Sequence, residues 1–280
     1  MGRLIKNEIK STAHSMVGIY AATIVSLGLL VIAMLAGIKW LQVFSAILIL
    51  IVPFLLVFIT VISVIRNYAS SLFGREGYLS HALPVKGGTL LASKTLVSVV
   101  WMVSSYFVML ATFIGGFYYI AVKAESNDTL IMIKELLATF IEAPTTGATI
   151  GAVFFVALSF FLQELVFVAD VYFSITLANT RPFQSHSVFW AIAFSFLFVV
   201  PTYILATYLT NVAPLSFILI PDNSGFIPEA MNIPKELSNY APTTGWSLRF
   251  GVAGMLFQLL SSAALLYFTA YMLNKKTNVK

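Results

Sequence analysis

The sequence predicts an all-α polytopic membrane protein in which residues 1–280 form one transmembrane domain. Of its 280 residues, 59% are hydrophobic and only 10% are charged, and the mean hydropathy is +0.93. Because a soluble domain has about 25% charged residues, this chain has too little polar surface to cover a water-soluble globule. Several uncharged runs also reach the roughly 20 residues that a helix needs to cross the hydrocarbon core. These runs are 14–38, 40–65, 95–122 and 250–274.

Six transmembrane helices are expected from these runs and from two further apolar stretches. We place them at residues 16–38, 42–65, 95–122, 147–178, 186–211 and 247–273. An even number of spans puts both termini on one side of the membrane. The loops and tails on that side hold eleven of the sixteen basic residues against only Glu8 and Glu76. Because Lys and Arg concentrate on the cytoplasmic side, both termini are predicted to be cytoplasmic. The net charge of +5 therefore reflects orientation and does not predict a nucleic-acid partner.

The segment before the first span mixes apolar residues with Lys6, Glu8 and Lys10. This pattern suits a short N-terminal interfacial helix that lies along the inner headgroups. A plain basic flank to the first span is the alternative.

A long loop precedes the sixth span on the outer side. Residues 213–245 contain five prolines and also the apolar stretch 215–220. We expect a re-entrant outer segment made of short half-helices that dip into the membrane where protein covers their backbone.

Glu164 and Asp170 interrupt the fourth span. A charged side chain within a membrane is costly, so such residues are paired, neutralised or functional. Since the two are six residues apart, about 240° around a helix, they cannot line the same stripe. They are either structural groups with a polar or basic neighbour, or residues of a translocation path or gate.

Enzymatic chemistry is not visible in the chain. Cysteine is absent, and the three histidines form no His-Glu-x-x-His pair. No Gly-x-Ser-x-Gly nucleophile elbow and no phosphate-cradling Gly-x-x-x-x-Gly-Lys loop occurs. We therefore expect no catalytic residue, no metal site and no cofactor in this chain.

The inner loop 66–94 is the most informative part of the sequence. It contains Arg-x-Tyr at 66–68, Gly-x-Glu-Gly-Tyr-Leu at 74–79, Leu-Pro-Val at 83–85 and Ser-Lys at 93–94. This pattern resembles that of permease subunits of bacterial ABC exporters of the six-helix class. Within this class, the chain looks similar to the permeases that export phenol-soluble modulins and other amphipathic peptides.

The resemblance implies a cytoplasmic coupling helix between the second and third spans, which docks on a separate ATPase. The residues to which it gives this coupling role are Leu72, Phe73, Arg75, Glu76, Tyr78 and Leu79. Apolar side chains of such a helix can enter a groove on a cytosolic partner, while the charged pair orients it at the rim. An ordinary basic cytoplasmic loop is the alternative interpretation.

Taken together, these features lead us to expect the permease of an ATP-driven exporter in the bacterial cytoplasmic membrane. Its partners would be cytosolic ABC ATPase subunits, which bind the ATP and Mg²⁺, and a second copy of itself or a close homologue. An amphipathic peptide is the expected cargo. An ion-coupled carrier that works alone, and a non-transporting membrane scaffold or sensor, are the rival hypotheses.

Overall fold

The computed structural model describes residues 2–74, 87–123, 147–212, 216–222, 225–231 and 248–275. Within these ranges, six helices are long and apolar enough to cross a membrane, which confirms the expected multi-pass helical protein. The helices are α1 (Gly2–Ala36), α2 (Lys39–Phe73), α4 (Gly87–Lys123), α6 (Gly147–Ala178), α7 (Ser187–Val212, preceded by the 3₁₀ helix η1, Gln184–His186) and α9 (Val252–Lys275).

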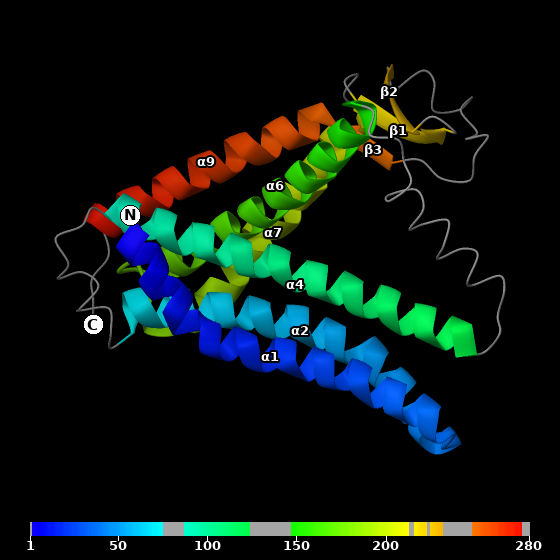
Figure 1. Ribbon diagram of the computed structural model, residues 1–280. Helices are drawn as coiled ribbons and strands as arrows, with labels where there is room; N and C mark the ends of the chain where they lie inside the picture. Colours follow the sequence, from blue (N-terminus) through cyan, green and yellow to red (C-terminus); the bar gives the residue numbers. More distant parts are fainter. Residues whose placement is uncertain are drawn as a thin grey trace.

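The helices form two groups of three. In one group α1, α2 and α4 pack against one another, and in the other α6 packs against α7 and α9. Figure 1 shows that the two groups are joined at the end where the N-terminus lies and diverge toward the opposite end. The helix α9 also finishes at the joined end, so the described chain begins and ends on the same side.

The first two helices form a tight antiparallel hairpin. Gly37 connects them with a positive φ of 68°, a conformation that costs glycine little because it has no Cβ. At 35 residues, α2 is about 52 Å long, which exceeds the roughly 30 Å hydrocarbon core. The helix must therefore be tilted or extend beyond the core.

A buried apolar cluster lies where α2, α4 and α6 meet near the joined end. The members of this cluster are Val64, Tyr68 and Leu72 of α2, Leu90, Leu91, Val99 and Met102 of α4, Val168, Val171, Tyr172 and Ile175 of α6, and Leu273 of α9. The two groups are thus held together at one end by close packing of side chains.

The helix bounds in the segments predicted to be cytoplasmic differ from those expected. The inner loop does not begin at residue 66, because α2 continues to Phe73 and α4 already begins at Gly87. The N-terminal segment is helical, as expected, and it forms one continuous helix with the first span, since α1 runs from Gly2 to Ala36 and its apolar span begins at Met16. No glycine or proline between residues 3 and 17 interrupts it, although Figure 1 shows its first turns at an angle to the rest.

The described part of the outer segment consists of strands, and the expected half-helices are wrong there. The strands β1 (Ser216–Asp222), β2 (Gly225–Met231) and β3 (Leu248–Gly251) form an antiparallel sheet in the order β2-β1-β3. Ser216 pairs with Met231 and Asp222 with Gly225. Isoleucine and phenylalanine favour strands, and proline disfavours a helix interior, which together explain this outcome.

Candidate functional site

A stacked pair of tyrosines joins the two helix groups. Tyr68 of α2 and Tyr172 of α6 are fully buried, with ring centroids 3.7 Å apart and planes inclined by 10°. Tyr68 Oη lies 2.7 Å from Thr176 Oγ1, and Tyr172 Oη lies 2.6 Å from Ser98 Oγ on α4. Both hydroxyls therefore have hydrogen-bond partners, as buried polar groups require. We call these four residues the tyrosine clasp.

A buried ion pair holds the start of α1 beside the clasp. Lys94 Nζ of α4 lies 2.6 Å from Glu8 Oε1, and the two side chains are only 2% and 16% exposed. Asn67 Nδ2 of α2 donates to Glu8 Oε2 over 3.2 Å. Each carboxylate oxygen of Glu8 thus has a donor, from a different helix. Such an arrangement stabilises a buried charge that would otherwise be costly.

Further hydrogen bonds that involve hydroxyl groups link α4 to α1 and α2. Trp101 Nε1 donates to Thr12 Oγ1 over 2.8 Å, and Tyr20 Oη lies 2.7 Å from Ser104 Oγ. On the α2 side, Thr60 Oγ1 lies 2.8 Å from Ser105 Oγ. The helix α4 is therefore bonded to both α1 and α2 within its own group.

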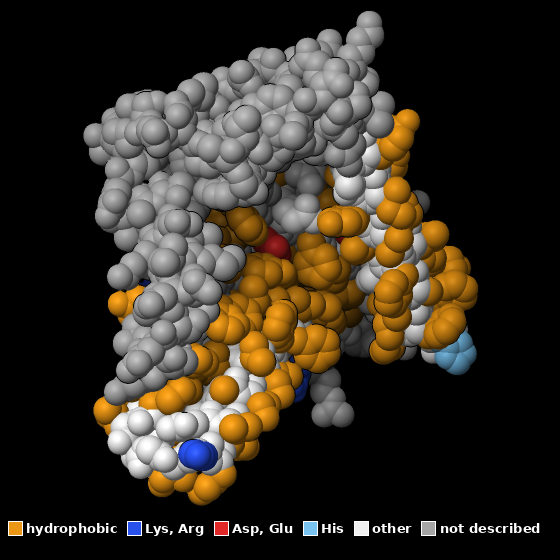
Figure 2. Space-filling model, turned by 90° about the vertical axis from the view of Figure 1, so that its right-hand side faces the viewer, with side chains coloured by type: hydrophobic (Ala, Val, Ile, Leu, Met, Phe, Trp, Pro, Cys, Tyr) orange, Lys and Arg blue, Asp and Glu red, His pale blue; other side chains and the backbone are white. Residues whose placement is uncertain are grey.

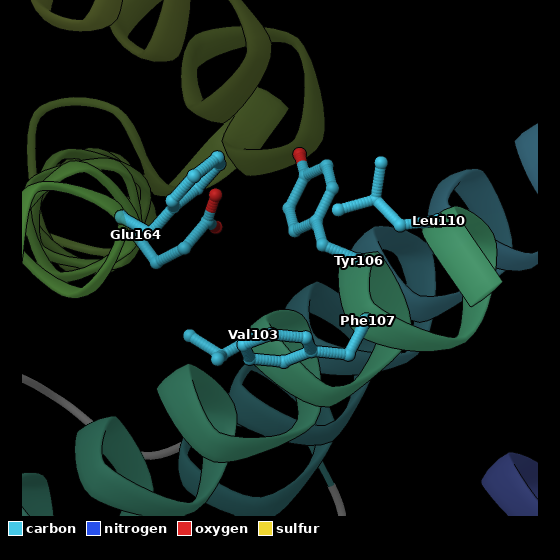
Figure 3. Close-up of a pocket in the computed structure, with 6 residues that line it drawn as sticks. Val103, Tyr106, Phe107, Leu110 and Glu164 are labelled. Atoms are coloured by element: carbon cyan, nitrogen blue, oxygen red, sulfur yellow. The ribbon is translucent and has the colours of Figure 1, made fainter. Parts of the chain in front are cut away.

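Glu164 lies beyond the joined end, in a pocket between α4 and α6. The pocket has about 280 Å³ of empty space, part of it open to the surroundings. It is lined by Val103, Tyr106, Phe107 and Leu110 of α4 and by Phe160 and Glu164 of α6. The α4 residues have the i, i+3, i+4, i+7 spacing of one helix face. Figure 3 shows the Glu164 carboxyl group pointing from α6 toward this face. We call this the Glu164 pocket.

The described residues that line the pocket are apolar or aromatic, apart from Glu164. Figure 2 views the molecule from the end where the groups diverge, and it shows an acidic side chain in a recess next to hydrophobic side chains of the described residues. Glu164 is 5% exposed, and its Oε2 atom has no hydrogen-bond partner among the described residues. No described residue thus supplies a hydrogen-bond donor to this oxygen atom.

Asp170 faces a different neighbour, as its helical offset from Glu164 predicts. It is 1% exposed, its Oδ1 has no hydrogen-bond partner within the described ranges, and its carboxyl group forms a side-chain hydrogen bond with Thr202 of α7. Asp170 does not line the Glu164 pocket. The two acidic residues of the fourth span thus belong to separate contacts.

The coupling residues predicted from the inner loop have different positions. Leu72 is fully buried in the core of this chain, so its side chain does not point toward a partner. Phe73 packs partly buried, edge-on to Tyr68 at a centroid distance of 6.2 Å. The remaining members, Arg75, Glu76, Tyr78 and Leu79, lie outside the described residues, and their coupling role stays a prediction.

Tyr68 and Lys94 enter the sequence pattern only as members of a loop motif, which does not predict their structural role. Both lie inside helices and make contacts across helices. The signal that could have found Tyr68 is helical spacing: Val64, Tyr68 and Leu72 follow one another at intervals of four, as on a buried helix face. No comparable signal in the sequence marks Lys94 as buried.

Comparison with models of protein families finds no match to this chain, and neither do comparisons with curated proteins and with solved structures.

Proposed function

We propose that this chain is the transmembrane permease subunit of an ATP-driven ABC exporter that moves amphipathic peptides out of the bacterial cell. The sequence pattern of residues 66–94 is the starting point of the proposal. In this arrangement both termini and the connection between α2 and α4 are cytoplasmic. Two separate ATPase subunits bind ATP with Mg²⁺, and a second copy of the chain or a close homologue completes the path.

The observation that carries the proposal is the position of the α2–α4 connection. The helix α2 ends at Phe73 and α4 begins at Gly87, both next to the buried cluster at the joined end. A partner that pushes on this connection acts directly on two helices of one group. Through the tyrosine clasp, the same push reaches α6 of the other group.

The arrangement supports a rigid-body mechanism. Packed cores switch between discrete arrangements and do not deform continuously, so a push at the joined end is transmitted as a tilt of whole helices. The two groups already diverge at the opposite end (Figure 1). Tilting them about the tyrosine clasp would widen or close that end, and this chain needs no nucleotide-binding residue of its own for that movement.

An amphipathic peptide is the cargo that fits the apolar surfaces best. Phe107 and Phe160 at the Glu164 pocket are 65% and 50% exposed, and few charged residues are present in the chain to hold a hydrophilic solute. A peptide that enters sideways from the membrane keeps its apolar face buried, and that burial is worth about 0.8 kcal/mol per methylene group.

The proposal is tested by reconstitution with the ATPase. In liposomes that contain both proteins, an amphipathic helical peptide should stimulate ATP hydrolysis and accumulate in an ATP-dependent manner. The control is a scrambled peptide of the same composition, in which the apolar residues no longer gather on one face of the helix. Equal stimulation by the scrambled peptide would remove peptide export, and failure of any ATPase to associate in mild detergent would remove the permease assignment.

A proton-coupled carrier is the second candidate, and the unpaired Oε2 atom of Glu164 favours it. A carboxyl group in a membrane-spanning helix is the kind of residue that relays protons in transporters. Liposomes that contain this chain alone separate the candidates. Flux driven by a pH gradient without ATP, abolished by Glu164→Gln, would replace the exporter proposal with the carrier.

A further inference from the structure

Glu164 lies near the middle of its membrane span. The span runs from Phe154 to Ala178, so Glu164 is about 15 Å of helix rise from one end and about 21 Å from the other. No other described residue that lines its pocket is charged. A carboxylate at this depth is costly unless it is paired, and the Oε2 atom of Glu164 has no partner among the described residues.

The side chains that line the pocket indicate the charge of a ligand group that would pair with Glu164. Three aromatic rings line it, those of Tyr106, Phe107 and Phe160. The faces of aromatic rings attract cations, and this attraction is strongest where water is excluded. A carboxylate with an unused oxygen also accepts hydrogen bonds, and an ammonium group offers three donors. Both features favour a cation with N–H groups over an anion or a neutral solute.

The size and the opening of the pocket indicate which part of a ligand it can hold. Its empty volume of about 280 Å³ includes space that is open to the surroundings, so the enclosed part is too small for a whole small ligand. Leu110 is 45% exposed, and the two phenylalanines at the rim are exposed to at least half. The pocket therefore fits a head group and the first methylene groups, while the apolar remainder of the molecule stays outside along the membrane-facing surface.

We propose that the Glu164 pocket binds the primary ammonium group of a lipophilic cation, with Glu164 as the ion-pair partner and Tyr106, Phe107 and Phe160 as the surrounding rings. The ammonium group belongs either to a long-chain amine or to a lysine side chain of an amphipathic helix. Binding of the ammonium group to the Glu164 pocket does not depend on the transport activity. A role of the pocket in binding exported cargo rests on the proposed export function.

Asp170 provides a matched control on the same helix. It is also buried and has one unpaired carboxylate oxygen within the described part of the chain, but Thr202 bonds its side chain and it is not part of the pocket. A general effect of removing a buried acidic group from α6 should therefore appear in Asp170→Asn. A specific effect on the pocket should appear only in Glu164→Gln.

The test measures binding of dodecylammonium to the purified chain in nanodiscs of zwitterionic phosphatidylcholine, by equilibrium dialysis at neutral pH with empty nanodiscs subtracted. We expect saturable binding by the unaltered chain. Glu164→Gln should weaken it at least about tenfold, because the amide oxygen of glutamine still accepts a hydrogen bond but carries no charge to pair with the ammonium group. Asp170→Asn should stay within about twofold, since distant sites act independently. Dodecanol, which has the same chain without the charge, should show no saturable binding.

Three results would overturn the proposal: unchanged affinity in Glu164→Gln, an equal loss in Asp170→Asn, or saturable binding of dodecanol as tight as that of the amine. Should Glu164→Gln fail to fold, the comparison of the amine with dodecanol on the unaltered chain still decides. Tyr106→Leu provides a second variant, which keeps the pocket apolar but removes a ring and should weaken binding of the amine severalfold.

A competition experiment distinguishes the two sources of the ammonium group. An amphipathic helical peptide with lysines should displace dodecylammonium if it is the natural ligand, whereas its Lys-to-Gln counterpart should not. Displacement by neither peptide restricts the site to long-chain amines.

Loss of amine binding in Glu164→Gln with undiminished peptide export would show that the pocket is not part of the cargo path, and the exporter proposal would remain. Amine binding by a chain that associates with no ATPase would leave the pocket standing and remove the exporter.

Discussion

Lys94 is buried and paired in a way that its position in the sequence does not predict. In the sequence it is a basic residue at the edge of a cytoplasmic loop, yet in the structure it is only 2% exposed. Its ammonium group is tolerated there because Glu8 approaches to 2.6 Å and Asn67 bonds the second oxygen of Glu8. Breaking such a pair leaves one buried charge without a partner, which costs more than the pair itself contributes.

Lys94→Met should therefore lower the free energy of unfolding by about 3 kcal/mol or more, because Glu8 loses its cation. The double variant Glu8→Gln, Lys94→Met should recover much of this loss, since no charge then remains buried at this contact. Both are measured by denaturant titration in detergent micelles. If the single variant unfolded at the same denaturant concentration as the unaltered chain, the ion pair would contribute nothing to stability.

At the scale of whole helices, contacts of α2 and α4 with α6 and of α4 with α9 connect the two groups. The tyrosine clasp contributes the ring stack and the Tyr68–Thr176 hydrogen bond between α2 and α6, and the Tyr172–Ser98 hydrogen bond between α6 and α4. An aromatic pair is worth about 0.5–1.5 kcal/mol beyond the burial of its area, and a hydrogen bond is worth a similar amount. The clasp thus adds to the apolar packing that holds the two groups together at this end.

Tyr172→Leu should destabilise the chain by about 2 kcal/mol, because it removes both the stack and the bond to Ser98. Tyr68→Phe is the milder comparison and should cost about 1 kcal/mol. It keeps the ring, and Thr176 still donates to the Tyr172 carbonyl oxygen. Unfolding in micelles reports both values. A larger loss in Tyr68→Phe than in Tyr172→Leu would contradict the importance of the stack.

The connection between α2 and α4 is the element that should contact the ATPase. The double variant Tyr78→Asp, Leu79→Asp should abolish docking of the ATPase while membrane insertion stays normal. Two charges would then enter an apolar contact whose anchors are worth about 2 kcal/mol each. Pull-down of the ATPase and peptide export are the measurements. Ser80→Asp is the control, since it adds a charge to the same connection and removes no apolar anchor. Wild-type export by the double variant would show that this connection is not the coupling element.

At the scale of the whole molecule, the even number of spans places the two ends of the described chain together. The helix α1 begins and α9 finishes at the joined end of the bundle (Figure 1). Which face of the membrane this is follows from the distribution of Lys and Arg, which predicts the cytoplasmic face.

The orientation can be tested directly because the chain has no cysteine. Single cysteines at Ser80 and Thr277 should be protected from a membrane-impermeant thiol reagent in intact cells. Cysteines at Ser126 and Ser238 should react with it. Permeabilised cells, in which all four positions should react, control for local burial. Labelling of Ser80 in intact cells would reverse the predicted topology.

The sequence by itself determined that the chain has six helices, within its described residues, that are long and apolar enough to cross a membrane. Length and hydropathy suffice for this, because a membrane-spanning segment must satisfy its backbone hydrogen bonds internally and present an apolar surface to lipid. The sequence also placed Glu164 and Asp170 on different sides of one helix, since helical periodicity is a local property.

Only the tertiary structure decided which residues from distant parts of the chain meet. Hydropathy does not reveal that Glu8 pairs with Lys94, that Tyr68 stacks on Tyr172, or that one face of α4 encloses Glu164. In a membrane, apolar residues face lipid as readily as protein, so the pattern along one helix does not identify its neighbours. The same limit explains why Leu72, expected at a partner's surface, lies in the core of this chain.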